Sequence, residues 1–257
     1  MGTDERLGLV GKSKAILEER LSLMAPARRL RLAESERELV RRFGAGGRVR
    51  ILDAGCGDGL LTLAMAARRR TWSLLGVDLR ADMLEGARRR ATARRLGNVE
   101  FREADLEQAV PGADFDAVLA TECLSEIPDD LRALRVMVAA LRPGGVLLVQ
   151  VPDRDWRPVL PGSSGTWREQ VRQGYTAEGL ATALREAGLE AISVRPTYRS
   201  LAAAAQEVRD RIKDSGLLLR LVAFPFLAAA TRLEYHGLTF GRANALIATG
   251  SKPQRLS

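Results

Sequence analysis

The sequence predicts an α/β fold: a doubly wound, mainly parallel seven-stranded sheet with helices on both faces. Apolar segments with strand character alternate with helical patterns from Arg48 onward, which is typical of such sheets. A glycine-rich turn, "DAGCGDG", follows the first strand and opens a helical pattern, and acidic residues stand at the ends of the next two strands. In this class of fold the ligand lies beyond the carboxyl ends of the strands, so these features predict where it binds.

Each element is indicated by its own pattern of apolar residues and turn residues. The predicted strands are 49–53, 72–78, 98–101, 115–120, 145–151, 189–195 and 243–250, and the predicted helices of the sheet layer are 60–70, 81–95, 130–141 and 177–187. The segment "RPGG", 142–145, is predicted to be a turn that leads into the fifth strand.

Two regions lie outside this alternation. An N-terminal helical cap, 1–47, contains two amphipathic helices, the second beginning at Pro26, a favoured first helical position. The sheet domain follows over 48–199, then a helical apolar insertion over 200–236, and finally the last strand and a tail over 237–257.

The composition indicates the cellular compartment and the kind of partner to expect. Two cysteines exclude a disulfide framework, and the charged residues among the first ten argue against a secretory leader, so we expect a cytoplasmic protein, either free or at the inner face of the membrane. The net charge of +8 comes almost entirely from arginine and raises the question of a nucleic-acid partner.

The spacing of the glycine turn indicates what it holds. Gly55 and Gly57 allow a ligand to approach the backbone closely, but G-x-G-x-G differs from the G-x-G-x-x-G of dinucleotide sites. Asp53 precedes the turn, and its charge would disfavour a pyrophosphate and suit a ligand carrying an ammonium or sulfonium group. Asp78 ends the second strand, where a carboxylate can bind ribose hydroxyls, and Asp105 follows the third, where one could accept a hydrogen bond from an adenine amino group.

Five segments in order resemble the successive motifs of class I (Rossmann-like) S-adenosylmethionine (SAM)-dependent methyltransferases of the bacterial small-molecule or lipid type. They are "ILDAGCGDG", "LLGVDLRADML", "VEFREADLE", "FDAVLATECLSEIPD" and "LRPGGVLLVQVP", and together they cover about residues 49–151. The resemblance implies SAM as cofactor and S-adenosylhomocysteine as product. A histidine is common in the family where Glu126 stands, so any role of that histidine is not carried over.

By this resemblance Asp53 orders the methionyl amino group, Asp78 binds the ribose and Asp105 the adenine. The implied cofactor-binding residues are Asp53, Gly55, Cys56, Gly57, Asp78, Leu79, Asp105, Leu106, Thr121 and Glu122. Asp78 and Asp105 have the alternative of being solvated acids or helix caps, and Glu122 that of a structural or acceptor-facing role. Cys56 and Cys123 end neighbouring strands and are expected to pack near the cofactor, and we expect no metal site.

The implied reaction is an in-line displacement, which needs a general base only if the acceptor must lose a proton. The candidate catalytic residues are Asp153 after the fifth strand, Tyr175 at the start of a helix, and His236, the single histidine. Each has a structural alternative: a solvated loop charge for Asp153, a packing role for Tyr175 and an uninvolved loop histidine for His236.

The insertion is the main departure from the core fold. If the sixth strand is parallel, the insertion emerges over the active-site mouth, and residues 216–235 are strongly apolar. Their longest uncharged run, 221–231, has 11 residues and is too short to span a bilayer. These residues would line an acceptor pocket, bury a homodimer contact or insert shallowly into a membrane. The first and third interpretations favour a hydrophobic acceptor: a lipid, isoprenoid, quinone or natural product.

Arginine clusters at 68–70 and 88–95 are expected at the sheet edge opposite the ligand, which disfavours nucleic acid as the partner. Arginines 28, 29, 31, 41 and 42 of the cap could reach the mouth. The alternatives are an RNA or protein methyltransferase that uses this cap, and a non-catalytic SAM-binding partner subunit. A nicotinamide dehydrogenase is disfavoured by the glycine spacing.

Overall fold

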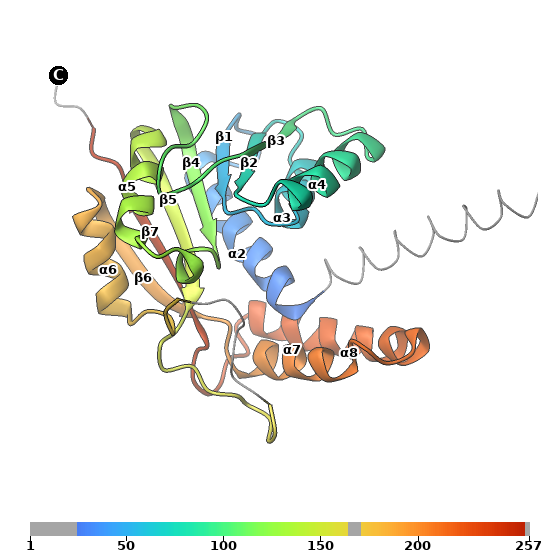
Figure 1. Ribbon diagram of the computed structural model, residues 1–257. Coiled ribbons are helices and arrows are strands. Elements are labelled where there is room, and N and C mark those ends of the chain that lie inside the picture. The colour runs from blue at the N-terminus through green and yellow to red at the C-terminus, as the bar shows by residue number, and fades with distance from the viewer. Residues whose placement is uncertain (1–24, 164–170, 255–257) are drawn as a thin grey trace, which may run out of the picture.

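The computed structural model describes residues 25–163 and 171–254 (Figure 1). The first predicted helix of the cap lies outside these residues. The second is α2, Pro26–Phe43, which begins with proline at its first position and ends at Gly44, as the sequence predicts.

One seven-stranded sheet organises the chain, in the order β3-β2-β1-β4-β5-β7-β6. Its strands are β1 (Arg50–Ala54), β2 (Ser73–Asp78), β3 (Val99–Glu103), β4 (Phe115–Thr121), β5 (Leu141–Pro152), β6 (Glu190–Thr197) and β7 (Ala245–Ser251). β7 runs antiparallel to both of its neighbours, so β6 runs parallel to β5 and the sheet is mainly parallel, as predicted.

Helices cover both faces of the sheet because successive residues of its strands point to opposite sides. Ile51 packs in a core with α2, α3 (Leu60–Arg68) and α4 (Ala81–Ala93), whereas Leu52 packs in a second core with α5 (Asp130–Ala140) and α6 (Ala177–Glu186). Figure 1 shows these two layers on either side of the strands.

β5 begins at Leu141, four residues before the predicted start, and includes the segment predicted as a turn. The register with β4 shifts between Phe115 and Ala117, which marks an irregularity at this point. Long-range contacts hold the irregular stretch in place: the N–H of Gly144 donates to the carbonyl of Lys252, and Arg142 Nε donates to Asp116 Oδ1 at 2.6 Å.

The insertion forms a pair of packed helices, α7 (Ser200–Ile212) and α8 (Leu217–Tyr235), at the carboxyl end of β6. Both helices contact α2, and Figure 1 shows them below the sheet beside the start of α2. Glu234 of α8 is buried and accepts hydrogen bonds from the N–H groups of Arg199 and Ala202 at the start of α7.

The outer face of α8 is apolar and exposed. Its side chains Leu218, Val222, Phe226 and Leu233 recur at helical spacing and are 50–77% exposed. Among residues 25–163 and 171–254, no helix is both long enough and apolar enough to cross a membrane.

Candidate functional site

A pocket of about 230 Å³ opens at the carboxyl ends of the first four strands; we call it the strand-end pocket. It is lined by Gly55, Asp78, Leu79, Arg80, Ala104, Asp105, Leu106, Glu107, Cys123, Glu126, Ile127 and Pro128. Five of the ten predicted cofactor-binding residues therefore line one cavity: Gly55, Asp78, Leu79, Asp105 and Leu106.

The glycine loop requires glycine for two separate reasons. Gly55, Gly57 and Gly59 have φ values of +71°, +54° and +68°, which side chains rarely allow. At Gly55 a Cβ atom would also lie 2.4 Å from the Cβ of Cys123. The loop thus brings bare backbone against the end of β4, next to the pocket.

Asp78 connects the glycine loop to the end of β2. Its side chain is 9% exposed. Oδ2 accepts a hydrogen bond from the N–H of Gly57 at 2.7 Å, and Oδ1 accepts from the backbone N–H and Nε of Arg80 at 3.0 and 3.2 Å. The carboxylate is thus fixed at the rim of the pocket, where ribose hydroxyls would need an acceptor.

Asp105 lines the pocket and also holds a turn. Its Oδ1 accepts from the N–H of Glu107 at 2.9 Å, and its Oδ2 accepts from Nε2 of Gln108 at 2.8 Å. Each oxygen keeps a second lone pair, so the turn-holding role does not prevent an adenine contact. That contact stays a prediction.

Asp53 lies beneath the loop and does not line the pocket. It is 3% exposed, and its Oδ2 accepts from Thr62 Oγ1 at 2.5 Å. Burial raises the pKa of this carboxyl to about 6; the hydrogen bond from Thr62 opposes the rise, and the negative charges of Asp78 and Asp58 add to it. A cation placed nearby would favour the ionised form.

Glu122 follows Thr121 at the end of β4 with φ +63°. Its Oε2 lies 3.0 Å from Nη2 of Arg31 on α2, and its Oε1 is buried without a hydrogen-bond partner among the described residues. Burial raises the pKa of Glu122, and the charge of Arg31 and its hydrogen bond oppose the rise. On the same helix, Arg28 pairs with Asp58 of the glycine loop at 2.9 Å. α2 is therefore tied to both sides of the site.

The two cysteines are free thiols. Cys123 lines the pocket and donates to the carbonyl of Ala54, and the side chain of Cys56, within the loop, packs against β2, where a Cβ on Gly76 would lie 3.0 Å from its sulfur. Burial raises the pKa of both, which keeps them protonated. Within the described part of the chain, no group of three or more histidine, cysteine or acidic residues could hold a metal.

The three candidate catalytic residues are not brought together around the pocket. Tyr175 is buried in the core, its hydroxyl donates to Asp130 Oδ2 at 2.6 Å, and it bridges to Asp153 through the backbone. The carboxylate of Asp153 accepts from the N–H of Asp155. His236 follows α8 and lines a different pocket. These positions favour packing and turn-holding roles for Tyr175 and Asp153.

Sequence reasoning missed several side chains at the site. Arg80 and Glu107 line the pocket, and each stands two residues after a predicted acid, so proximity in sequence was an available signal. Arg28 and Arg31 were expected to reach the mouth, but their partners Asp58 and Glu122 depend on how α2 packs, which no local pattern gives.

Residues 51–145 match a protein family described as "Methyltransferase domain". Among curated relatives, trans-aconitate 2-methyltransferase of Azoarcus sp. is 31% identical over 138 residues, which is 52% of this chain and 53% of the relative. The enzyme of the same name from Rhodopseudomonas palustris strain BisB18 is 38% identical over 104 residues, 40% of this chain and 39% of the relative. The chain thus spans about half the length, or less, of these relatives.

Solved structures agree on the fold. The [4+2]-cyclase SpnF matches with a TM-score of 0.63 at 24% identity, and the match covers 86% of this chain and 82% of the cyclase chain. Phosphoethanolamine N-methyltransferase 2 of Haemonchus contortus, solved with SAM, matches with a TM-score of 0.62 at 20% identity. That match covers 86% of this chain and 53% of the Haemonchus chain. The cyclase shows that this fold alone does not decide the reaction.

The domain match covers the glycine loop, the strand-end acids and the strands that position them. The sheet order and the strand-end pocket agree with that match. Over residues 51–145 the chain is therefore similar to the class I S-adenosylmethionine-dependent methyltransferases, and its sheet has the fold of solved members.

Proposed function

We propose that the protein transfers the methyl group of SAM to a small-molecule acceptor. A lone pair of the acceptor attacks the methyl carbon, the carbon–sulfur bond breaks, and its electrons remain on sulfur as S-adenosylhomocysteine leaves. The observation that carries the proposal is that α2 is tied by Arg28 to Asp58 and by Arg31 to Glu122, directly beside the strand-end pocket.

The pocket suits the adenosine part of the cofactor. Asp78 and Asp105 offer carboxylate oxygens to ribose and adenine, and Leu79 and Leu106 supply apolar surface. The methionine end would then extend along the glycine loop toward Asp53 and Glu122, both of which favour a positively charged neighbour. Catalysis would rest mainly on alignment, since SAM is already activated.

The acceptor would approach over the ends of β4 and β5, beneath α2. There, Gln150 of β5 donates to Ser35 Oγ and to the carbonyl of Arg31, and its own Oε1 is buried without a partner among the described residues. A helix lying this close to the strand ends favours a small acceptor over a macromolecule. Arg28 and Arg31 are also held by acids, which weakens the case for RNA binding by the cap.

Two classes of small acceptor have support. The hydrophobic acceptor expected from the sequence is supported by the exposed apolar face of α8 beside the cap, although that face points outward and does not line the strand-end pocket. A small carboxylic acid is supported by the names of the relatives and by the polar groups under α2. Both fit the proposed reaction.

The test is incorporation of labelled methyl from SAM in a cell extract, with products divided into organic, aqueous and macromolecular fractions, and with trans-aconitate supplied in parallel. Label in a small-molecule fraction that is lost with Asp78→Ala and kept with Asp214→Ala, an exposed acid, would support the proposal. Label sensitive to nuclease or protease would contradict it. Absence of label from protein that binds SAM by calorimetry would contradict catalysis and favour a SAM-binding subunit.

A further inference from the structure

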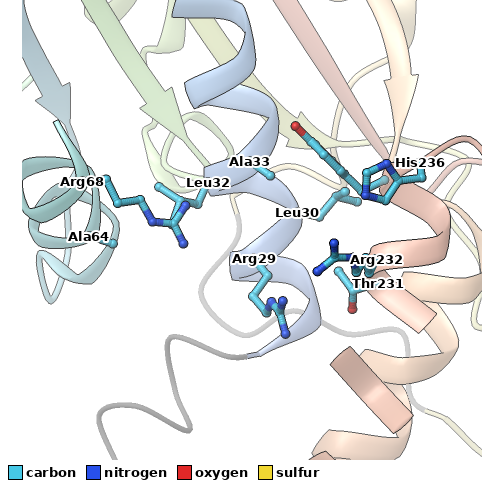
Figure 2. A pocket seen from close by; sticks show the side chains of 10 residues that line it. Arg29, Leu30, Leu32, Ala33, Ala64, Arg68, Thr231, Arg232 and His236 are labelled. Carbon is cyan, nitrogen blue, oxygen red and sulfur yellow. The ribbon is translucent and has the colours of Figure 1, made fainter. Parts of the chain in front are cut away.

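A second cavity, of about 530 Å³, lies between α2, α3 and α8; we call it the outer pocket. Its floor is apolar and comes mainly from α2, whereas its walls carry Arg29, Arg68, Arg232 and His236. Figure 2 shows Arg68 reaching from α3 and Arg232 from α8 toward the two sides of α2, with Arg29 between them.

The outer pocket is separate from the methyl-transfer site. Arg28 and Arg31 point from α2 to Asp58 and Glu122, whereas Arg29, about 100° further round the helix than Arg28, faces the outer pocket. The outer and strand-end pockets share no lining residue, and in Figure 2 the strands lie behind α2. A ligand here would bind across α2 from the cofactor.

Positive charge in the outer pocket is only partly balanced. Arg68 pairs with Glu36 at 3.0 Å, but Glu36 also binds Arg69 at 2.6 Å. In the described part of the chain, no acid forms an ion pair with Arg29 or Arg232. Burial and the positive charges of Arg68 and Arg232 lower the pKa of Arg29. Three guanidiniums from three helices therefore face one cavity with one shared carboxylate.

We propose that the outer pocket binds a phosphate group. Guanidinium forks bind phosphate oxygens in paired, charge-assisted hydrogen bonds, and three of them from different helices suit a group with several oxygens. The apolar floor, formed by Leu30, Leu32, Ala33 and Ala64, would hold the carbon part of a phosphate ester.

Two sources of that phosphate group fit the surroundings. A soluble phosphate ester would fill the pocket alone. The headgroup of an anionic lipid would also place its chains near the apolar side chains that neighbour the pocket residues in the chain, Leu233, Leu238 and Phe240, which are 50–56% exposed. The chemistry at the arginines is the same in both cases.

Thermal unfolding in inorganic phosphate and in glycerol 3-phosphate, at ionic strength matched with chloride, tests the site. At about 100 times the dissociation constant the Tm should rise by roughly 5–10 °C. Arg29→Gln and Arg232→Gln should abolish the rise, and Arg135→Gln, an exposed arginine of α5, should keep it. Without phosphate, Arg29→Gln should leave the Tm unchanged or higher because it removes repulsion, whereas a purely structural arginine would give a lower Tm.

Binding to lipid vesicles distinguishes the two sources of the phosphate group. Sedimentation with phosphatidylcholine vesicles containing phosphatidic acid, but not with phosphatidylcholine alone, and its loss in Arg29→Gln and Arg232→Gln, would assign the site to a lipid headgroup. A Tm rise with glycerol 3-phosphate and no sedimentation would assign it to a soluble ester. No response to either, a response to citrate and not to phosphate, or equal responses of all variants would overturn the proposal. SAM titration of the same variants should be unchanged. A failure of the phosphate proposal can therefore be distinguished from a failure of the proposed methyl transfer.

Discussion

Arg31 and Glu122 join the cap to the carboxyl ends of the strands: Nη2 of Arg31 lies 3.0 Å from Oε2 of Glu122. The two side chains are only 16% and 18% exposed, so little water screens the pair. Because burial raises the pKa of Glu122 and Arg31 opposes the rise, Arg31 helps to keep this carboxyl ionised where the positively charged methionine end of SAM is proposed to lie.

Arg31→Gln is expected to lower the free energy of unfolding by about 1–3 kcal/mol, because it leaves Glu122 buried without its countercharge. The double variant with Glu122→Gln should cost less than the sum of the single changes. Urea unfolding measures all three. Arg89→Gln is the control, since Arg89 and Glu85 are both about two-thirds exposed and their pair should contribute under about 1 kcal/mol. Additive single and double changes would mean that the pair is not coupled.

Titration of Asp53 should make the stability of the folded protein depend on pH. Its pKa of about 6 lies above that of an unfolded aspartate, near 3.9, so the folded protein binds more protons than the unfolded chain between those values. The free energy of unfolding should therefore fall by about 3 kcal/mol as the pH rises from about 4 to 6, and it should stay at this lower value above that range.

Asp53→Asn should consequently stabilise the cofactor-free protein at pH 7.5 by up to about 3 kcal/mol and have a smaller effect at pH 4.5. The same change should weaken SAM binding about tenfold at pH 7.5, since it removes a negative charge near the proposed ammonium position. Urea unfolding at both pH values and calorimetric titration measure the two effects. An equal change in stability at both pH values would show that the carboxyl does not titrate in this range.

Gly55→Ala should abolish measurable SAM binding and destabilise the fold by about 2 kcal/mol or more, because the new methyl group meets Cys123 and the backbone has positive φ. Gly97→Ala is the matched control, since a Cβ there has open space and no positive φ, and its effect should stay within about 0.5 kcal/mol. Calorimetry and thermal unfolding compare the two. Normal SAM binding by the Gly55 variant would remove the loop from the cofactor site.

The sequence predicts those parts of the fold that local patterns determine. Alternating strands and helices give the sheet, and because parallel strands end at one edge, their order along the chain is enough to place Gly55, Asp78 and Asp105 together. The start of β5 could not be placed, since contacts of Arg142 with Asp116 and of Gly144 with Lys252 hold it across long sequence separations.

The outward face of α8 could not be predicted either. Helical spacing indicates that Leu218, Val222 and Phe226 share a face, but periodicity does not tell which neighbour covers it, and the structure leaves that face exposed. The candidate catalytic residues have the same limitation. The sequence places Asp153 at the correct end of the sheet and Tyr175 at the start of a helix, but only side-chain contacts reveal that both are already engaged.

Tyr175→Phe separates the two roles considered for that residue. Its hydroxyl donates to Asp130 at 2.6 Å and accepts from Arg172 at 3.2 Å, so its removal should cost about 1.5–3 kcal/mol of unfolding free energy. Burial, followed by Asp130, raises the pKa of Tyr175 above its ordinary value, so the phenol stays protonated and is a poor general base near neutral pH. We therefore expect kcat and KM of methyl transfer to be unchanged at a temperature where the variant is fully folded.

Tyr235→Phe is the control for removing a tyrosine hydroxyl. That hydroxyl accepts a hydrogen bond from Arg37 at an exposed position and should contribute under about 1 kcal/mol. A Tyr175 variant that unfolds like the native protein but loses at least tenfold in kcat would reverse the assignment, because a residue that only packs cannot change the rate without changing stability. The opposite pattern, lower stability with normal kcat, would mean that Tyr175 stabilises the position of α5. Catalysis would then rest on alignment of SAM and acceptor, without a tyrosine base.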